Sequence, residues 1–217
     1  QAFGSRSICR IALYPRCLTW MRDGRPAPDS HKGARLRIGD SSLSVEELGS
    51  LEQLTAVLEL QQPELDVDLR DVSAIVEDPL LSLLCEAVPR RTTSLILNLL
   101  GCTRITGKGF RSIDAPLGHL QVDLSYCTGL EDAGMQLFVA ALPKKLASFS
   151  LKLTFCYKLG DASLCSLSAG LPDSLRSLTL CLEGCARIGR LGVQQLAAAL
   201  QLAPRLMSLS LNLGSCS

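Results

Sequence analysis

The chain has 217 residues, of which 47% are hydrophobic and 20% charged, so it can bury a core and is neither disordered nor a coiled coil. Its formal charge of +1 gives no net field to attract nucleic acid or an anionic membrane. No apolar stretch approaches the roughly 18 to 20 residues that span a bilayer, so the sequence predicts neither a nucleic-acid binder nor a membrane protein.

The first segment, residues 1–33, predicts an irregular N-terminal arm. It mixes arginines with Pro15, Pro26 and Pro28, and it lacks the apolar run and small-residue cleavage site of a secretory signal. The chain begins with Gln1 rather than Met, which we interpret as a sign of a fragment or an incomplete gene model.

Residues 34–64 are predicted to be a degenerate first repeat or an N-terminal cap. Leu36 and Ile38 indicate a weak strand, and apolar residues at helical spacing from Leu43 onward predict a helix. Ser44, which precedes two glutamates, is a good helix start because its hydroxyl and the early acids satisfy free amide groups and the helix dipole.

A repeating unit is present from Leu65 onward. It becomes visible when the chain is aligned on five of its ten cysteines, which are 25, 29, 29 and 31 residues apart: Cys102, Cys127, Cys156, Cys185 and Cys216. The residues three, five and seven positions before each cysteine are apolar in every copy, as Leu99, Leu97 and Leu95 are in the first. An earlier copy at Leu65 keeps this frame with Val72 in place of the cysteine.

The alternation of apolar residues has period two, which predicts a short strand whose leucines point to one side. Segments rich in helix formers follow and end near Pro143 or Pro204. Each unit is therefore predicted to be a strand, a turn and a helix. The predicted strands are 95–99, 120–124, 149–153, 178–182 and 209–213.

Stacking such units buries their apolar sides between a parallel sheet and a row of helices. The predicted fold class is therefore α/β, a curved solenoid over residues 34–217 with clear repeats over 65–217. The last repeat is truncated, because the chain stops at Ser217 after a strand and a turn. We expect the native protein to continue beyond Ser217, or another chain to cover this end, because the edge lacks a capping repeat.

The pattern Leu-x-x-Leu-x-Leu-x-Leu-x-x-Cys-x-x-Ile/Leu-x-x-x-Gly resembles the leucine-rich repeat family. Residues 127–134 are similar to its cysteine-containing subclass, known from F-box receptor subunits, and the unit length near 29 also resembles the ribonuclease-inhibitor type. The resemblance implies a solenoid with helices on its convex face and a binding surface on its concave face. The likeness to F-box receptors implies the substrate-recognition part of a ubiquitin ligase, although these residues contain no F-box segment.

The repeated cysteines are either a metal site or small buried hydrophobic residues whose S–H groups bond to turn carbonyls. Buried thiols are favoured, because the sequence has no Cys-x-x-Cys and spacings near 29 bring no four sulfurs together. Reduced thiols imply a cytoplasmic compartment, with the nucleus as the alternative. Cys181 should face outward, since it lies between Leu180 and Leu182, and an ordinary surface cysteine is favoured over a reactive thiol.

The sequence contains no complete catalytic or cofactor-binding motif. Residues 107–109 lack the first glycine and the Ser or Thr of a phosphate-binding loop, and are predicted to be a turn before a repeat helix. His119 has no serine or cysteine partner at a suitable spacing, and carboxylates such as Glu131 and Asp132 are expected to be solvated surface. We therefore predict no catalytic residue, no cofactor and no metal ion.

The outward strand positions remain as candidates for binding, and small and polar side chains dominate there. Tyr126 and Phe155, each just before a cysteine, add two aromatic residues on the rim that either anchor a partner or pack on each other. The candidate partner-binding residues on the concave face are Asp66, Asp68, Asn98, Gln121, Asp123, Tyr126, Lys152, Phe155, Thr179, Glu183 and Asn212.

These features predict a non-catalytic protein-protein interaction module. Its partner is expected to be a protein, and we expect no nucleic acid, no membrane and no small-molecule substrate. The alternative from another class is an α/β enzyme whose sheet only mimics repeats. That alternative requires a glycine-rich strand-to-helix turn or a nucleophile with its base, and neither is found in the sequence.

Overall fold

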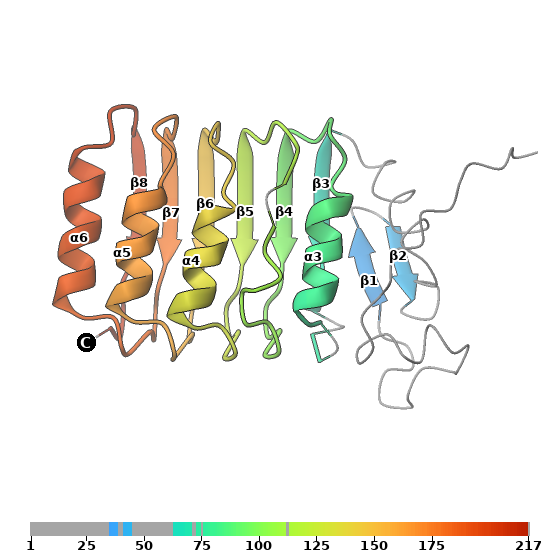
Figure 1. The fold of residues 1–217 in the computed structure, drawn as a ribbon, viewed down its shortest axis with the longest axis horizontal. Coiled ribbons are helices and arrows are strands. Elements are labelled where there is room, and N and C mark those ends of the chain that lie inside the picture. The colour runs from blue at the N-terminus through green and yellow to red at the C-terminus, as the bar shows by residue number, and fades with distance from the viewer. Residues whose placement is uncertain are drawn as a thin grey trace, which may run out of the picture.

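The structure, a computed structural model, describes residues 35–38, 41–44, 63–70, 73–74, 76–111 and 113–216. Its main feature is an eight-stranded sheet with the spatial order β2-β1-β3-β4-β5-β6-β7-β8 (Figure 1). Strands β3 to β8 pair in parallel and in chain order. They are β3 (Glu64–Asp68), β4 (Ser94–Asn98), β5 (His119–Asp123), β6 (Ser148–Lys152), β7 (Ser177–Cys181) and β8 (Ser208–Asn212).

All five predicted strands are confirmed as parallel, and each observed strand lies one residue earlier than predicted. The strands pair without a shift in register, so equivalent residues of successive repeats lie side by side, as Val122 of β5 and Leu151 of β6 do. The inward residues therefore form continuous rows across the sheet. The fold is a leucine-rich repeat solenoid, as the sequence pattern predicts.

The N-terminal part of the sheet does not follow the parallel pattern. Strands β1 (Arg35–Ile38) and β2 (Ser41–Ser44) form an antiparallel hairpin, and β1 pairs antiparallel with β3. The strand expected at Leu36 and Ile38 is present, whereas Leu43, expected in a helix, lies in β2. The expected arm, residues 1–33, and the rest of the helix expected after Ser44 fall outside the described residues.

In the described part of the chain, the helices form one layer against a single face of the sheet (Figure 1). They are α3 (Asp78–Ala87), α4 (Asp132–Ala140), α5 (Asp161–Gly170) and α6 (Arg190–Gln201). The described residues between β4 and β5 contain no helix, so the prediction of a helix in every unit is wrong for this repeat.

The missing helix follows from the length of that repeat. Cys102 and Cys127 are 25 residues apart, whereas the next two spacings are 29, so the connection is about one helical turn too short. Phe110, from the loop that replaces the helix, is buried and packs edge-on against Phe138 of α4, with 4.6 Å between the ring centroids. A single aromatic side chain therefore fills part of the layer that helices fill elsewhere.

The core lies between the sheet and the helices and consists of the inward strand residues and the helix residues that face them. Leu178 and Leu180 of β7 are 0% and 1% exposed. Their equivalents in β8, Leu209 and Leu211, are 46% and 40% exposed. The inward leucines of β8, which has a described repeat on one side only, are therefore much less covered than those of β7.

An aspartate at the first position of three helices ties each repeat to the next. The Asp78 carboxylate accepts hydrogen bonds from three backbone N–H groups of residues 106–109 at 3.1 to 3.3 Å. Asp132 accepts the N–H of Gly160 at 2.8 Å, and Asp161 accepts an N–H of its following repeat at 2.7 Å. Each carboxylate lies at a helix N-terminus, where the helix dipole favours negative charge. The aspartates therefore position the turns that follow them.

Substitution of an inward leucine should destabilise the fold, while its outward neighbour should matter little. Leu151 is completely buried, so we expect Leu151→Ala to lower the free energy of unfolding by about 2 to 5 kcal/mol through the cavity it leaves. Lys152→Ala is the matched control and should change it by less than about 0.5 kcal/mol, because Lys152 is exposed and its 3.7 Å pairing with Asp123 is weak. Denaturant unfolding measures both, and equal effects would contradict the assignment of the two faces.

Candidate functional site

The concave face is the side of the sheet opposite the helices, formed by the outward side chains of β3 to β8. Register places these side chains in two rows that cross the strands. The first row is Asp66, Ile96, Gln121, Ser150, Thr179 and Ser210, and the second is Asp68, Asn98, Asp123, Lys152, Cys181 and Asn212. The predicted strand candidates therefore lie next to one another on one surface.

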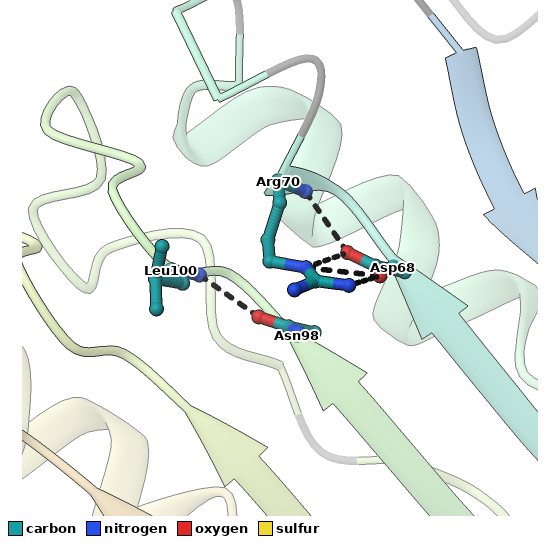
Figure 2. A network of polar contacts seen from close by, with 4 residues as sticks. All are labelled: Asp68, Arg70, Asn98 and Leu100. Carbon is teal, nitrogen blue, oxygen red and sulfur yellow. Dashed lines mark hydrogen bonds and ion pairs between the residues drawn. The ribbon is translucent and has the colours of Figure 1, made fainter.

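Four candidates of the second row also hold the turn that follows their strand. The side-chain oxygens of Asp68 and Asn98 accept the N–H group two residues further on at 3.1 and 3.2 Å (Figure 2). Asp123 and Asn212 do the same, both at 3.0 Å. Only a short side chain that ends in an oxygen makes this contact, which explains the Asp and Asn at this position. These residues therefore have a structural task in addition to the predicted one.

The charged candidates are engaged with their neighbours. Arg70 donates from Nε and Nη2 to the Asp68 carboxylate at 3.0 and 2.6 Å (Figure 2). Asn212 donates to Glu183 of the preceding repeat at 3.1 Å. Exposed pairs of this kind contribute little to stability. They do hold the polar side chains of this face in fixed positions, which lowers the entropy lost when a partner binds.

Two apolar side chains that are not among the binding residues predicted from the sequence belong to the same surface. Ile96 of β4 and Leu100, just after that strand, are each 37% exposed. Leu100 lies beside the contacts of Asn98 and Arg70 in Figure 2. The sequence could have identified both residues, because they occupy outward positions of the alternation, where the core does not require an apolar residue.

Tyr126 and Phe155 lie in the turn immediately after β5 and β6 and contact each other, with 5.2 Å between ring centroids. Tyr126 therefore packs on Phe155, as one of the two alternatives for these residues states, and its ring is still 45% exposed. Their φ angles are 61° and 58°, in the left-handed region that favours glycine. Bulky residues in this conformation cost about 1 to 3 kcal/mol each.

Glycine occupies the same turn position in two other repeats. Gly101 and Gly184 have φ angles of 76° and 73°. Gly184 is further constrained because a Cβ atom there would lie 2.3 Å from the Phe155 ring. The turn thus requires a left-handed residue in each of these repeats, and the fold retains two aromatic side chains where glycine is the unstrained choice.

The repeated cysteines form a ladder of buried thiols. Three of these Sγ atoms donate a hydrogen bond to the carbonyl of a leucine in the preceding repeat, at 3.2 Å for Cys127 and Cys156 and 3.1 Å for Cys185. Burial raises the pKa of Cys102 to about 12 and that of Cys185 to about 11. Among the described residues, no group of three His, Cys, Asp or Glu side chains is placed to hold a metal ion.

The other residues that were considered as candidate sites in the sequence have structural roles. Residues 107–109 form the predicted turn, but no helix follows among the described residues before β5. The N–H groups of Gly107 and Gly109 donate to Asp78. Asp132, expected as solvated surface, is partly buried and bonds to the next repeat, because its helix start packs against that turn. Glu131 is exposed, as expected, and pairs with Lys158 at 2.6 Å.

Comparison with protein-family models gives no match, and no curated protein matches the chain. Among solved structures, a chain of the yeast Rad7 and Elc1 complex is similar, with 22% sequence identity and a TM-score of 0.45. The match covers 64% of this chain and 34% of that one, so this chain spans about a third of its length. A likeness of this extent carries no information on partner or activity. Within the described residues, no helix is both long and apolar enough to cross a membrane.

The strain at the aromatic turn can be measured with two substitutions at one position. Tyr126→Gly and Tyr126→Ala both remove the ring, but only glycine relieves the left-handed conformation. We expect the glycine variant to be more stable than the alanine variant by about 1 kcal/mol, the reverse of the usual order. Urea unfolding of the two proteins tests this. An alanine variant of equal or greater stability would contradict the strain.

The buried thiols predict a loss of stability at alkaline pH. Their folded-state pKa values lie above the ordinary value of 9.0, so this contribution is complete below pH 9 and disappears as pH rises through about 11 to 12. Urea unfolding from neutral pH to about pH 11, with a non-thiol reductant, measures this decline. Cys156→Ala should make the decline shallower, whereas Cys165→Ala, an exposed control, should leave it unchanged. Identical slopes in all three proteins would contradict the thiol contribution.

Proposed function

We propose that this chain is a non-catalytic protein-protein interaction module that binds its partner on the concave face. One observation carries the proposal: the outward side chains of six paired parallel strands form a wide surface on which apolar Ile96 and Leu100 lie among ordered polar groups. Protein interfaces combine an apolar centre with a polar surround in this way. The partner is a protein, and the proposal includes neither nucleic acid nor a small-molecule substrate.

Three cavities in the described part of the chain lie on the helix side of the sheet. Two are about 20 Å³ each, and both are lined by Leu95, Leu97 and Ile113. A third, of about 250 Å³, lies between the ends of α5 and α6 and is lined largely by apolar side chains. These cavities supply no cluster of titratable groups for acid-base chemistry, which supports binding rather than catalysis.

The cysteines support a reducing compartment, cytoplasmic or nuclear. Their sulfurs bond to main-chain carbonyls rather than to one another, and the described cysteines are free thiols. A narrower form of the proposal, the substrate-recognition part of a ubiquitin ligase, places a degradation substrate on the same concave face. It depends on the resemblance of residues 127–134 to the cysteine-containing repeats of F-box receptors.

The test compares charge placed on the two faces of the solenoid. Ile96→Asp combined with Leu100→Asp changes the concave face, and Leu137→Asp, at a residue of α4 that is 45% exposed, is the matched change on the helix face. Tagged proteins are used for affinity capture followed by mass spectrometry, after thermal melts confirm that the variants fold. We expect the concave variant to lose the proteins that the wild type captures and the helix-face variant to retain them. Equal capture by all three would contradict binding on the concave face.

A further inference from the structure

A second surface lies beyond the concave face, at the edge of the sheet where the parallel strands end. Tyr126, Phe155 and Tyr157 form what we call the aromatic ridge, with ring centroids 5.2 and 5.9 Å apart in succession. Tyr126 and Tyr157 are 45% and 51% exposed. The ridge therefore presents a continuous aromatic surface to solvent, across two adjacent repeats.

A cluster of positive charge borders the ridge. Lys158 follows Tyr157 in the chain, and its Nζ lies 2.6 Å from the Glu131 carboxylate. Arg187 of the next repeat donates from Nη1 to the main-chain carbonyl of Lys158 at 3.1 Å. The hydrogen bond and charge of Lys158, with smaller contributions from Arg187 and Lys108, lower the pKa of Glu131. We call Lys158 and Arg187 the cationic cluster, which places two positive charges beside one exposed carboxylate.

Three further carboxylates lie near this edge, and one of them, Glu183 beside Phe155, accepts a hydrogen bond from Asn212. Asp132 accepts the N–H of Gly160 and the hydroxyl of Ser163, and Asp161 accepts the N–H of Gly189. Their charges are balanced by these donors and by the helix dipoles at whose N-termini they lie. The cationic cluster therefore retains the capacity to bind an additional anion.

We propose that the aromatic ridge and the cationic cluster together form a docking surface for an acidic polypeptide segment with aromatic or aliphatic side chains beside its carboxylates. The inference rests on the proposed function and specifies the chemistry of the partner. Charge complementarity requires an anionic ligand, and the exposed rings favour an apolar group directly beside that charge. The strained conformation of Tyr126 and Phe155 supports the same conclusion, because it is retained where glycine fits better.

A polypeptide is favoured over a nucleic acid by the charge of the whole chain. A nucleic acid would also offer anions and flat rings, but its binding normally depends on an extended positive field. The formal charge of this chain is only +1. A short segment needs only a local cluster, since one or two of its carboxylates match the charges of Lys158 and Arg187 while its apolar side chains contact the rings.

The binding test uses a fluorescein-labelled synthetic peptide that alternates Glu with Phe and Leu, with fluorescence anisotropy as the readout. Two matched peptides replace either every Glu by Lys or every Phe and Leu by Ser, and an oligouridine of similar length represents nucleic acid. We expect the acidic apolar peptide to bind best and its affinity to fall with added salt. Stronger binding of oligouridine, or equal binding of all three peptides, would overturn the proposal.

Variants of the protein then locate the binding surface. Lys158→Gln with Arg187→Gln should weaken peptide binding about tenfold, from two exposed charges acting together. Lys144→Gln with Lys145→Gln, two exposed lysines in the turn that precedes β6, is the matched control and should leave affinity unchanged. Glu131→Gln should strengthen binding, because it removes the carboxylate that competes with the peptide. An equal loss in the control pair, or weaker binding by Glu131→Gln, would overturn the proposal.

The concave variant separates this inference from the proposed function. An uncharged form of the concave variant, Ile96→Ser with Leu100→Ser, should leave peptide binding intact, because it adds no carboxylate that repels the peptide and changes no residue of the ridge or the cationic cluster. If a captured partner is lost by that variant but retained by Lys158→Gln with Arg187→Gln, the edge is not the docking surface and the proposed function stands. If the wild type binds the acidic peptide but no partner depends on the concave face, the proposed function fails instead.

Discussion

The turns after strands β4 to β7 each depend on one main-chain hydrogen bond to the next repeat. The N–H of the residue before the cysteine donates to a carbonyl of the following repeat, at 2.8 Å for Gly101, Tyr126, Phe155 and Gly184 alike. A residue in the left-handed conformation makes this bond in all four cases. Because the hydrogen bonds between repeats continue past the strand ends, the backbone of the turn adopts the same conformation whichever side chain is present. The inward direction of the thiol and the outward direction of the aromatic ridge both follow from this backbone conformation.

The sequence predicts the strands well because one constraint acts on every copy. Inward positions must be apolar to be buried, so Leu151 and Leu180 mark the register that the structure shows. The one-residue shift in the boundaries has a physical cause. Leu153, the last apolar residue of its triplet, still points inward and still donates to the next repeat, although the regular strand has ended before it. Periodicity therefore locates side chains more accurately than it locates strand ends.

Other features were harder to predict from the sequence because they depend on contacts between repeats. The short spacing between Cys102 and Cys127 could have indicated the missing helix, although a helix was predicted there, and only packing shows that Phe110 takes its place. The turn contacts of Asp68 and Asn98 illustrate a second limit. A polar residue at an outward position looks like a binding residue in the sequence, whereas its side chain also satisfies the backbone two residues later. The sequence pattern alone does not distinguish a residue that binds a partner from one that bonds to the backbone of its own turn.

In such a solenoid the backbone holds the repeats together, so the outward side chains can vary and provide specificity for a binding partner. Most outward strand residues can change without altering the ladder, since the bonds between repeats are formed by main-chain groups. Tyr126 and Phe155 are different, because their conformation is fixed by the ladder and their side chains make it costly. Ring packing offsets only part of such strain, since an aromatic pair contributes about 0.5 to 1.5 kcal/mol. At these two positions the fold therefore gives up stability and keeps two aromatic rings on the surface that we propose for docking.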